Sequence, residues 1–159
     1  MKLALGTVQF GLDYSISNTA GQVSVDEVSK ILDFARSVNL DTLDTAQAYG
    51  SAEQVLGSLA QTRHFKLISK ISQANSLPDK LRPSIEQSLQ TLKLDVLDGI
   101  LLHDADILLQ PQGSVVYDQL TQAKHAGLVK KIGVSVYHPQ QLIELCQRFS
   151  LDMVQLPLN

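Results

Sequence analysis

The sequence predicts an α/β fold in which strands and helices alternate along a single chain. Short apolar segments of strand length recur through the 159 residues, and between them lie segments whose apolar residues repeat at helical intervals. No linker or low-complexity run interrupts this alternation, so we expect residues 1–159 to form one domain. Right-handed crossovers between consecutive strands would make the sheet parallel.

The first half of the chain contains three predicted strands, at residues 2–8, 40–44 and 65–71. A polar segment with turn-forming residues follows the first strand, and helices are expected at 25–38 and 51–60. The spacing of helix-capping boxes is found twice, in Ser24 with Glu27 and in Ser51 with Gln54. A third helix is indicated by Ile85, Leu89 and Leu92. Pro83 is tolerable if it lies in the first turn of that helix.

The second half of the chain continues the same alternation. Strands are predicted at residues 96–102, 129–136 and 152–156, and helices at 113–126 and 139–149. Gly127 has the usual position of a glycine that ends a helix. The complete chain is therefore expected to contain six strands and five helices.

Two architectures fit this alternation: an open doubly wound sheet, and part of a TIM-type (β/α)8 barrel. An open dinucleotide-binding sheet usually carries G-x-G-x-x-G after its first strand, and Gly6, Gly11 and Gly21 do not have that spacing. The barrel is therefore preferred. Because a complete barrel takes about 250 residues, we expect it to be incomplete here, with the last two βα units absent.

The composition favours a small-molecule partner. The net charge of −3 is spread along the chain without basic clusters, so binding to nucleic acid or to a membrane surface has little support. No segment is long and apolar enough to cross a bilayer or to act as a signal peptide, and we expect a cytoplasmic protein. The single cysteine, Cys146, lies in an apolar helical pattern and is expected to be a buried structural thiol.

Ionisable residues stand at the ends of three successive predicted strands. Asp44 ends the second strand, Lys70 the third and His103 the fourth, and Tyr49 lies in the loop after Asp44. Each has an ordinary structural explanation, as a cap, a solvated charge or a packing residue. Parallel strands, however, bring their carboxyl ends to one rim, and four such residues together predict an active site there.

These four residues have the chemistry of a proton donor acting on a carbonyl. A lysine beside Tyr49 would lower the phenol pKa from about 10, and Asp44 would keep Lys70 charged. His103 could orient a carbonyl oxygen and stabilise its developing charge. Because no side chain supplies hydride, a nicotinamide cofactor is implied.

In these features the chain resembles the aldo-keto reductases. The resemblance rests on residues in the same order along the whole chain, namely Gly6-Thr7, Asp44-Thr45-Ala46, Tyr49-Gly50, Glu53, Lys70, His103-Asp104, Gly133-Val134-Ser135 and Gln155. It implies reduction of aldehydes or ketones with NADPH, or with NADH, and Tyr49 as the general acid. Lys70 and Asp44 would tune Tyr49, and His103 would position the carbonyl.

The resemblance also implies a cofactor site. Ser135 and Gln155 would hydrogen-bond the nicotinamide carboxamide, and Thr7 and Asp44 would lie near its ribose. The chain has Val136 where many members of the family carry asparagine. The last two strands, which hold the cofactor phosphates in the family, are absent, so we expect a truncated form with impaired cofactor binding. Its exposed barrel edges would favour self-association.

Three other functions fit the sequence less well. A non-catalytic binding or regulatory subunit of the same family is the main alternative. A Schiff-base lyase using Lys70 is less favoured, because Asp44 would stabilise the charged amine. A metal hydrolase has no support, and no metal ligands are expected, because the histidines form no recognisable ligand pair at the strand ends.

Overall fold

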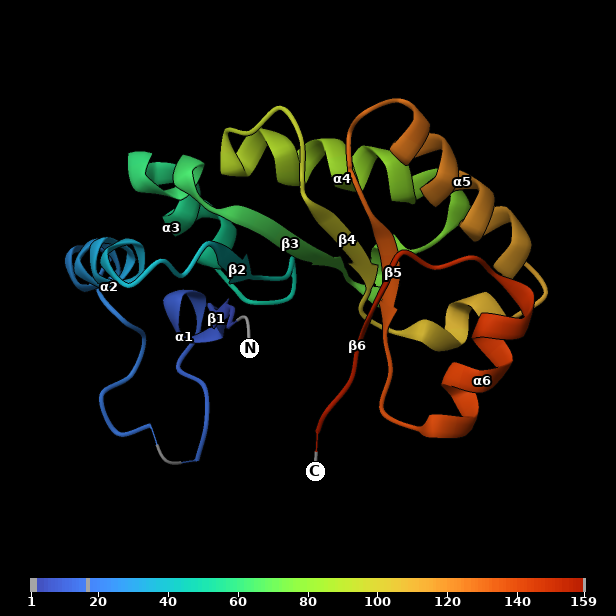
Figure 1. Ribbon diagram of the computed structural model, residues 1–159, viewed down its shortest axis with the longest axis horizontal. Coiled ribbons are helices and arrows are strands. Elements are labelled where there is room, and N and C mark those ends of the chain that lie inside the picture. Colours follow the sequence, from blue (N-terminus) through green and yellow to red (C-terminus); the bar gives the residue numbers. More distant parts are fainter. Residues whose placement is uncertain (1–2, 17, 159) are drawn as a thin grey trace.

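The computed structural model describes residues 3–16 and 18–158, and its centre is one six-stranded parallel sheet. The strands follow one another in chain order, as expected for a barrel and unlike a doubly wound sheet. Their bounds are β1 Leu5–Gly6, β2 Thr42–Asp44, β3 Lys66–Ile71, β4 Gly99–Leu102, β5 Ile132–Ser135 and β6 Met153–Gln155. The predicted fold is confirmed: the sheet is curled into a partial barrel, with helices along its outside (Figure 1).

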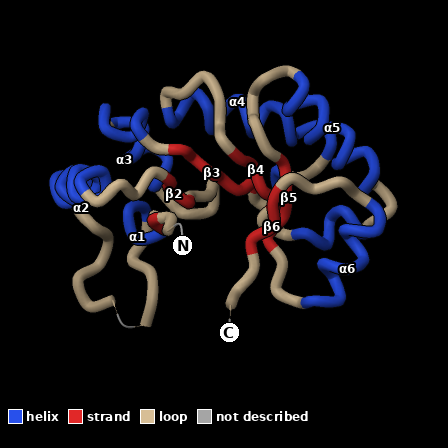
Figure 2. Tube along the Cα trace, viewed as in Figure 1, coloured by secondary structure: helices blue, strands red, loops and turns tan. Residues whose placement is uncertain are grey.

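The helices form an outer arc around the strands (Figure 2). They are α1 Val8–Gly11, α2 Val25–Ser37, α3 Ala52–Ser58, α4 Pro78–Leu92, α5 Gly113–His125 and α6 Pro139–Arg148, with short 3-10 turns η1 Ala60–His64, η2 Gln73–Asn75 and η3 Ala105–Leu109. The five predicted helices are all present. The short helix α1 was predicted as a loop. None of the described helices combines the length and apolar character needed to cross a lipid bilayer.

The helix starts predicted from capping serines and prolines are confirmed in part. Ser24 caps α2 as predicted, its hydroxyl accepting from the Glu27 amide at 3.3 Å. Ser51 precedes α3 but makes no capping bond, because its hydroxyl instead accepts from Gln22 Nε2 at 2.9 Å. Pro83 was placed in the first turn of α4 and in fact lies further inside it, because Pro78 begins the helix earlier.

The core lies between the sheet and the helices that cover its outer face. Leucine, isoleucine and valine side chains from both layers are fully buried there, among them Leu32, Leu56, Leu67, Ile85, Ile100, Val116 and Val134. One prediction about burial was wrong. Leu145 of α6 faces this core, whereas the next residue, Cys146, is exposed, because each step along a helix turns the side chain by about 100°.

The two ends of the sheet differ from its middle. Within the described residues, β1 pairs only with β2 and β6 only with β5, whereas the four strands between them have neighbours on both sides. Figure 1 shows β1 and β6 at opposite ends of the curl, with the N- and C-terminal regions on the same side. Self-association through these edges stays a prediction.

Candidate active site

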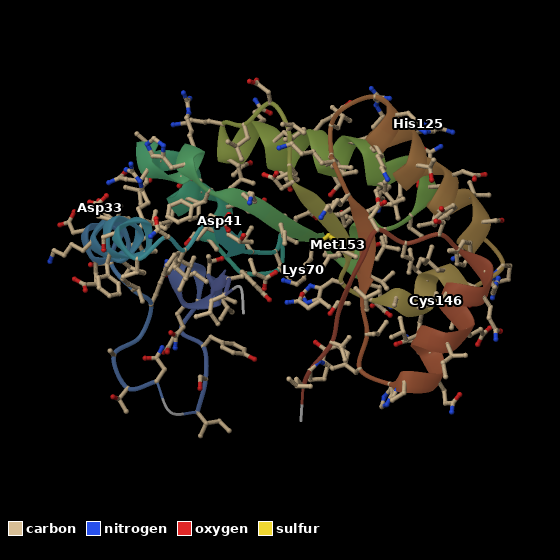
Figure 3. The ribbon with its side chains drawn as sticks, in the orientation of Figure 1. Asp33, Asp41, Lys70, His125, Cys146 and Met153 are labelled. Carbon is tan, nitrogen blue, oxygen red and sulfur yellow. The ribbon has the colours of Figure 1, made fainter. Side chains whose placement is uncertain are left out.

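Lys70 and Asp44 form a buried ion pair between neighbouring strands. Lys70 Nζ donates to Asp44 Oδ1 at 2.7 Å and to the Thr45 carbonyl at 3.1 Å. The Lys70 side chain is only 2% exposed, and Figure 3 labels it near the middle of the curled sheet. An ammonium removed from water in this way needs such partners to remain charged. The pair therefore places a fixed positive charge at the carboxyl end of β3.

Tyr49 lies beside this ammonium, in the loop between β2 and α3. Lys70 Nζ donates to Tyr49 Oη at 3.3 Å and lies 5.0 Å from the centre of the Tyr49 ring. On its other side, Tyr49 meets His103, with ring centroids 6.0 Å apart and the planes nearly perpendicular. The structure thus brings together all four predicted residues from three successive strand ends.

The pKa of Tyr49 differs from the prediction. Burial, and then the negative charge of Asp44, raises the pKa of Tyr49 to about 12, whereas a lowered value was expected from Lys70. The phenol is therefore fully protonated at neutral pH. Because Lys70 Nζ lies within hydrogen-bond distance of Tyr49 Oη, it can stabilise the phenolate that forms when a proton leaves.

His103 is placed to act as a neutral imidazole. Burial, followed by the positive charge of Lys70, lowers the pKa of His103 from its usual 6.5. A neutral ring carries one N–H donor and one acceptor nitrogen. His103 can therefore donate a hydrogen bond to an oxygen near Tyr49 without adding a second positive charge.

Two glycines position the Tyr49 loop against α1. A Cβ on Gly11 would lie 1.8 Å from the Tyr49 carbonyl oxygen, and Gly50 has a positive φ of 56°. The Ser51 amide also donates to the Gly11 carbonyl at 3.3 Å. Side chains at either glycine would push the loop outward. The sequence pattern gave no sign of this role for Gly11, which enters the prediction only through the absent G-x-G-x-x-G spacing.

The predicted cofactor residues surround the same end of the sheet. Gln155 Nε2 donates to Asp44 Oδ2 at 3.2 Å, and the Thr7 hydroxyl donates to the Asp44 carbonyl at 3.0 Å. Ser135 is buried and lies beside Gln155 in the register of β5 and β6. Gln155 Oε1 is buried and accepts no hydrogen bond from the described residues. This free acceptor suits an amide N–H₂ group, such as a carboxamide.

Fold and site together define a barrel-type protein with a tyrosine, a histidine and a buried lysine–aspartate pair at the carboxyl ends of its strands. Comparison with protein families agrees: the model of the aldo/keto reductase family matches residues 2–159. The chain belongs to the aldo/keto reductase family.

Curated relatives have similar sequences over most of this chain. The oxidoreductase sirO of Leptosphaeria maculans is 29% identical over 139 residues, which are 84% of this chain and 42% of that protein. Methylglyoxal reductase DkgB of Yersinia pestis is 32% identical over 119 residues, which are 72% of this chain and 43% of that protein. The chain thus spans less than half the length of these relatives.

Solved structures agree with the fold. An aldo-keto reductase structure from Pseudomonas aeruginosa has 27% sequence identity and a TM-score of 0.81, covering 96% of this chain and 61% of that one. The Bombyx mori aldo-keto reductase AKR2E4, solved in complex with NADP, has a TM-score of 0.77 at 22% identity. That alignment covers 99% of this chain and 54% of the Bombyx chain, and at this identity it supports the fold alone.

Proposed function

We propose that this chain carries the proton-donor half of a carbonyl reductase that converts aldehydes or ketones to alcohols. The observation that supports this best is the position of Lys70 Nζ, within hydrogen-bond distance of both Asp44 Oδ1 and Tyr49 Oη. A lysine ammonium held in this way favours loss of the proton from the phenol of Tyr49. The ammonium is already protonated, so it does not itself accept that proton.

The proposed reaction adds a hydride to the carbonyl carbon and a proton to its oxygen. The Tyr49 hydroxyl and the His103 N–H hold the carbonyl oxygen and stabilise the negative charge that develops on it. Tyr49 then gives its proton to that oxygen. Lys70 stabilises the remaining phenolate, and Asp44 keeps the ammonium in place. The phenol recovers its proton from solvent.

A bound nicotinamide cofactor would supply the hydride. We propose NADPH as this cofactor, with NADH as the weaker candidate. The residues fit this group, because Gln155 Oε1 is a buried acceptor without a partner in the described chain. Gln155 and Ser135 would hold the carboxamide, and Thr7 and Asp44 would lie toward the ribose. Val136, which is buried, offers no polar side chain to the same group.

The test is turnover of NADPH with a reactive aldehyde such as 4-nitrobenzaldehyde, followed by the loss of nicotinamide absorbance. Tyr49→Phe should reduce the rate by about 10²- to 10⁴-fold, the usual contribution of a general acid. Tyr117→Phe is the matched control, because the Tyr117 hydroxyl bonds to the Ser150 carbonyl, away from the site.

Two results would contradict the proposal. Turnover that survives Tyr49→Phe would exclude Tyr49 as the acid. Absence of turnover in a sample that binds NADPH in calorimetry would favour a non-catalytic subunit, because impaired cofactor binding could not then account for it. Trapping of Lys70 by borohydride with a carbonyl compound would instead indicate Schiff-base chemistry.

A further inference from the structure

A polar network, buried except for the partly exposed Gln47, lies behind the candidate site, between the outer face of the sheet and α4. It consists of Gln47, Glu53, Ser69, Ser84 and Ser88, and Glu53 is a carboxylate only 7% exposed. The proton-donor mechanism does not use these residues. A buried carboxylate costs free energy unless hydrogen bonds compensate for the lost water. The hydrogen-bond partners of Glu53 therefore identify the elements that it connects.

Glu53 connects three elements. On α3, its Oε1 accepts from the Ser69 hydroxyl of β3 at 2.7 Å, and its Oε2 accepts from the Ser88 hydroxyl of α4 at 3.1 Å. Ser69 directly precedes Lys70 in the chain, so its side chain points to the opposite face of the sheet. Glu53 therefore holds β3 from the outer face of the sheet, at the residue directly before Lys70.

Gln47 anchors the other end of the Tyr49 loop. Its backbone amide donates to the Lys70 carbonyl at 3.0 Å, and its side-chain Nε2 donates to Ser88 Oγ at 2.9 Å. The Ser84 hydroxyl bonds the same amide side chain at 2.7 to 2.9 Å. Gln47 thus ties the loop both to β3 and to α4.

The directions of these bonds form a continuous path. Gln47 Nε2 donates to Ser88, the Ser88 hydroxyl donates to Glu53, and Ser69 donates to the other Glu53 oxygen. The Ser69 and Ser88 hydroxyls each use their single proton toward the carboxylate. The path begins two residues before Tyr49 and returns four residues after it, so both ends of the loop are fixed to the same serine of α4.

We propose that Gln47 and Glu53 are positioning residues, which hold the Tyr49 loop at a fixed distance from Lys70 through Ser88 and Ser69. The inference rests on the proposed function, since positioning matters only if Tyr49 and Lys70 act together. Displacing a reacting group by about 1 Å can reduce a rate by about a hundredfold. In this proposal, the network keeps Lys70 Nζ and Tyr49 Oη at their separation of 3.3 Å.

The first measurement is amide hydrogen exchange, which does not depend on turnover. Ser88→Ala removes the link between Gln47 and Glu53, and Ser69→Ala removes the link to β3. In both variants the Gln47 and Tyr49 amides should exchange about tenfold faster, because the loop opens locally more often. Ser58→Ala on the same helix, α3, is the matched control, because the Ser58 hydroxyl bonds to the Val55 carbonyl of its own helix and takes no part in the network.

The second measurement is steady-state kinetics with NADPH and the aldehyde. Ser88→Ala and Ser69→Ala should lower kcat by about tenfold and leave the KM for NADPH within about twofold, as expected for misplaced catalytic groups. Glu53→Gln should restore most of kcat relative to Glu53→Ala, because an amide can still accept from one serine and donate to the other.

The two measurements separate the possible failures. Unchanged exchange at Gln47 and Tyr49 in Ser88→Ala would overturn the positioning role, whatever the turnover. Faster exchange with unaltered kcat would overturn it as well, because the loop would move without affecting the reaction. If the unmodified chain binds NADPH but shows no turnover, the proposed function fails, and faster exchange would then leave the network as an anchor of the loop alone.

Discussion

Strands β2 and β3 are joined by two aspartate–lysine pairs, one at each end. Asp41 and Lys66 form an ion pair at the amino-terminal end, with side chains 49% and 54% exposed. Asp44 and Lys70 form one at the carboxyl end, with side chains 19% and 2% exposed. The residue types and the strands are the same, so the difference lies in access to water.

That difference decides what each pair can do. Water and salt screen the exposed pair, so it adds little to stability and cannot impose a strong field on a neighbour. The buried pair acts in a less polar medium, where its ammonium faces Tyr49 and shifts the protonation of His103. Chemistry is therefore expected only at the carboxyl end of the sheet.

The largest effect should follow from Lys70→Met. It leaves the Asp44 carboxylate without its ammonium, which should cost about 3 kcal/mol in the free energy of unfolding. It should also lower turnover by about a hundredfold or more, because nothing stabilises the Tyr49 phenolate. Urea denaturation and the NADPH assay measure these effects. Equal losses of stability in Lys70→Met and Lys66→Met would remove the distinction between the two pairs.

A smaller effect is expected from Glu53→Gln, and it should depend on pH. Burial raises the pKa of Glu53 above its ordinary 4.5, despite the bonds from Ser69 and Ser88. A raised pKa in the folded state means that the contribution of the carboxyl group is present below the ordinary value and is lost as pH rises. The variant should therefore gain stability relative to the unmodified chain as pH rises.

The measurement for Glu53→Gln is urea unfolding at several pH values from about 4 to about 8. Asp79 and Lys80 of α4 line the cavity beside Glu53, so Asp79→Asn serves as the control for charge loss nearby. A constant difference in the free energy of unfolding between Glu53→Gln and the unmodified chain across this range would contradict the expectation. It would show that the pKa of Glu53 is the same in the folded and unfolded states.

His103→Gln should show the opposite dependence on pH. Burial and Lys70 lower the pKa of His103 below 6.5, so its contribution to stability is present above that value and is lost as pH falls. The unmodified chain should lose stability relative to His103→Gln on acidification from about pH 7.5 to about pH 5.5. His125→Gln on α5, labelled in Figure 3, controls for the loss of an imidazole. Parallel pH curves for His103→Gln and the unmodified chain would contradict this expectation.

The smallest effect belongs to Lys66→Met. Its partner Asp41 remains half exposed and can be solvated by water, so we expect little change in the urea midpoint and none in turnover. Any small difference should disappear in high salt, whereas the Lys70→Met effect should persist. A loss of turnover in Lys66→Met would show that the amino-terminal end of the sheet also takes part in function.

Much of the site could be predicted because its residues sit at the ends of predicted strands. The position of Lys70 relative to Asp44 follows from parallel register, and Tyr49 is only five residues from Asp44 in the chain. The network behind it could not be predicted. Ser69, Ser84 and Ser88 have no distinctive spacing with Glu53, and their hydrogen bonds join segments far apart in sequence.

The sequence by itself determined the order of strands and helices, the parallel sheet and the rim on which the ionisable groups gather. These follow from apolar periodicity and from crossover handedness, which are local rules. Only the tertiary structure decided that the pKa of Tyr49 rises rather than falls, that Cys146 faces solvent and that Glu53 is buried behind Lys70. Each of these depends on how many atoms from distant segments surround a side chain, which no local pattern records.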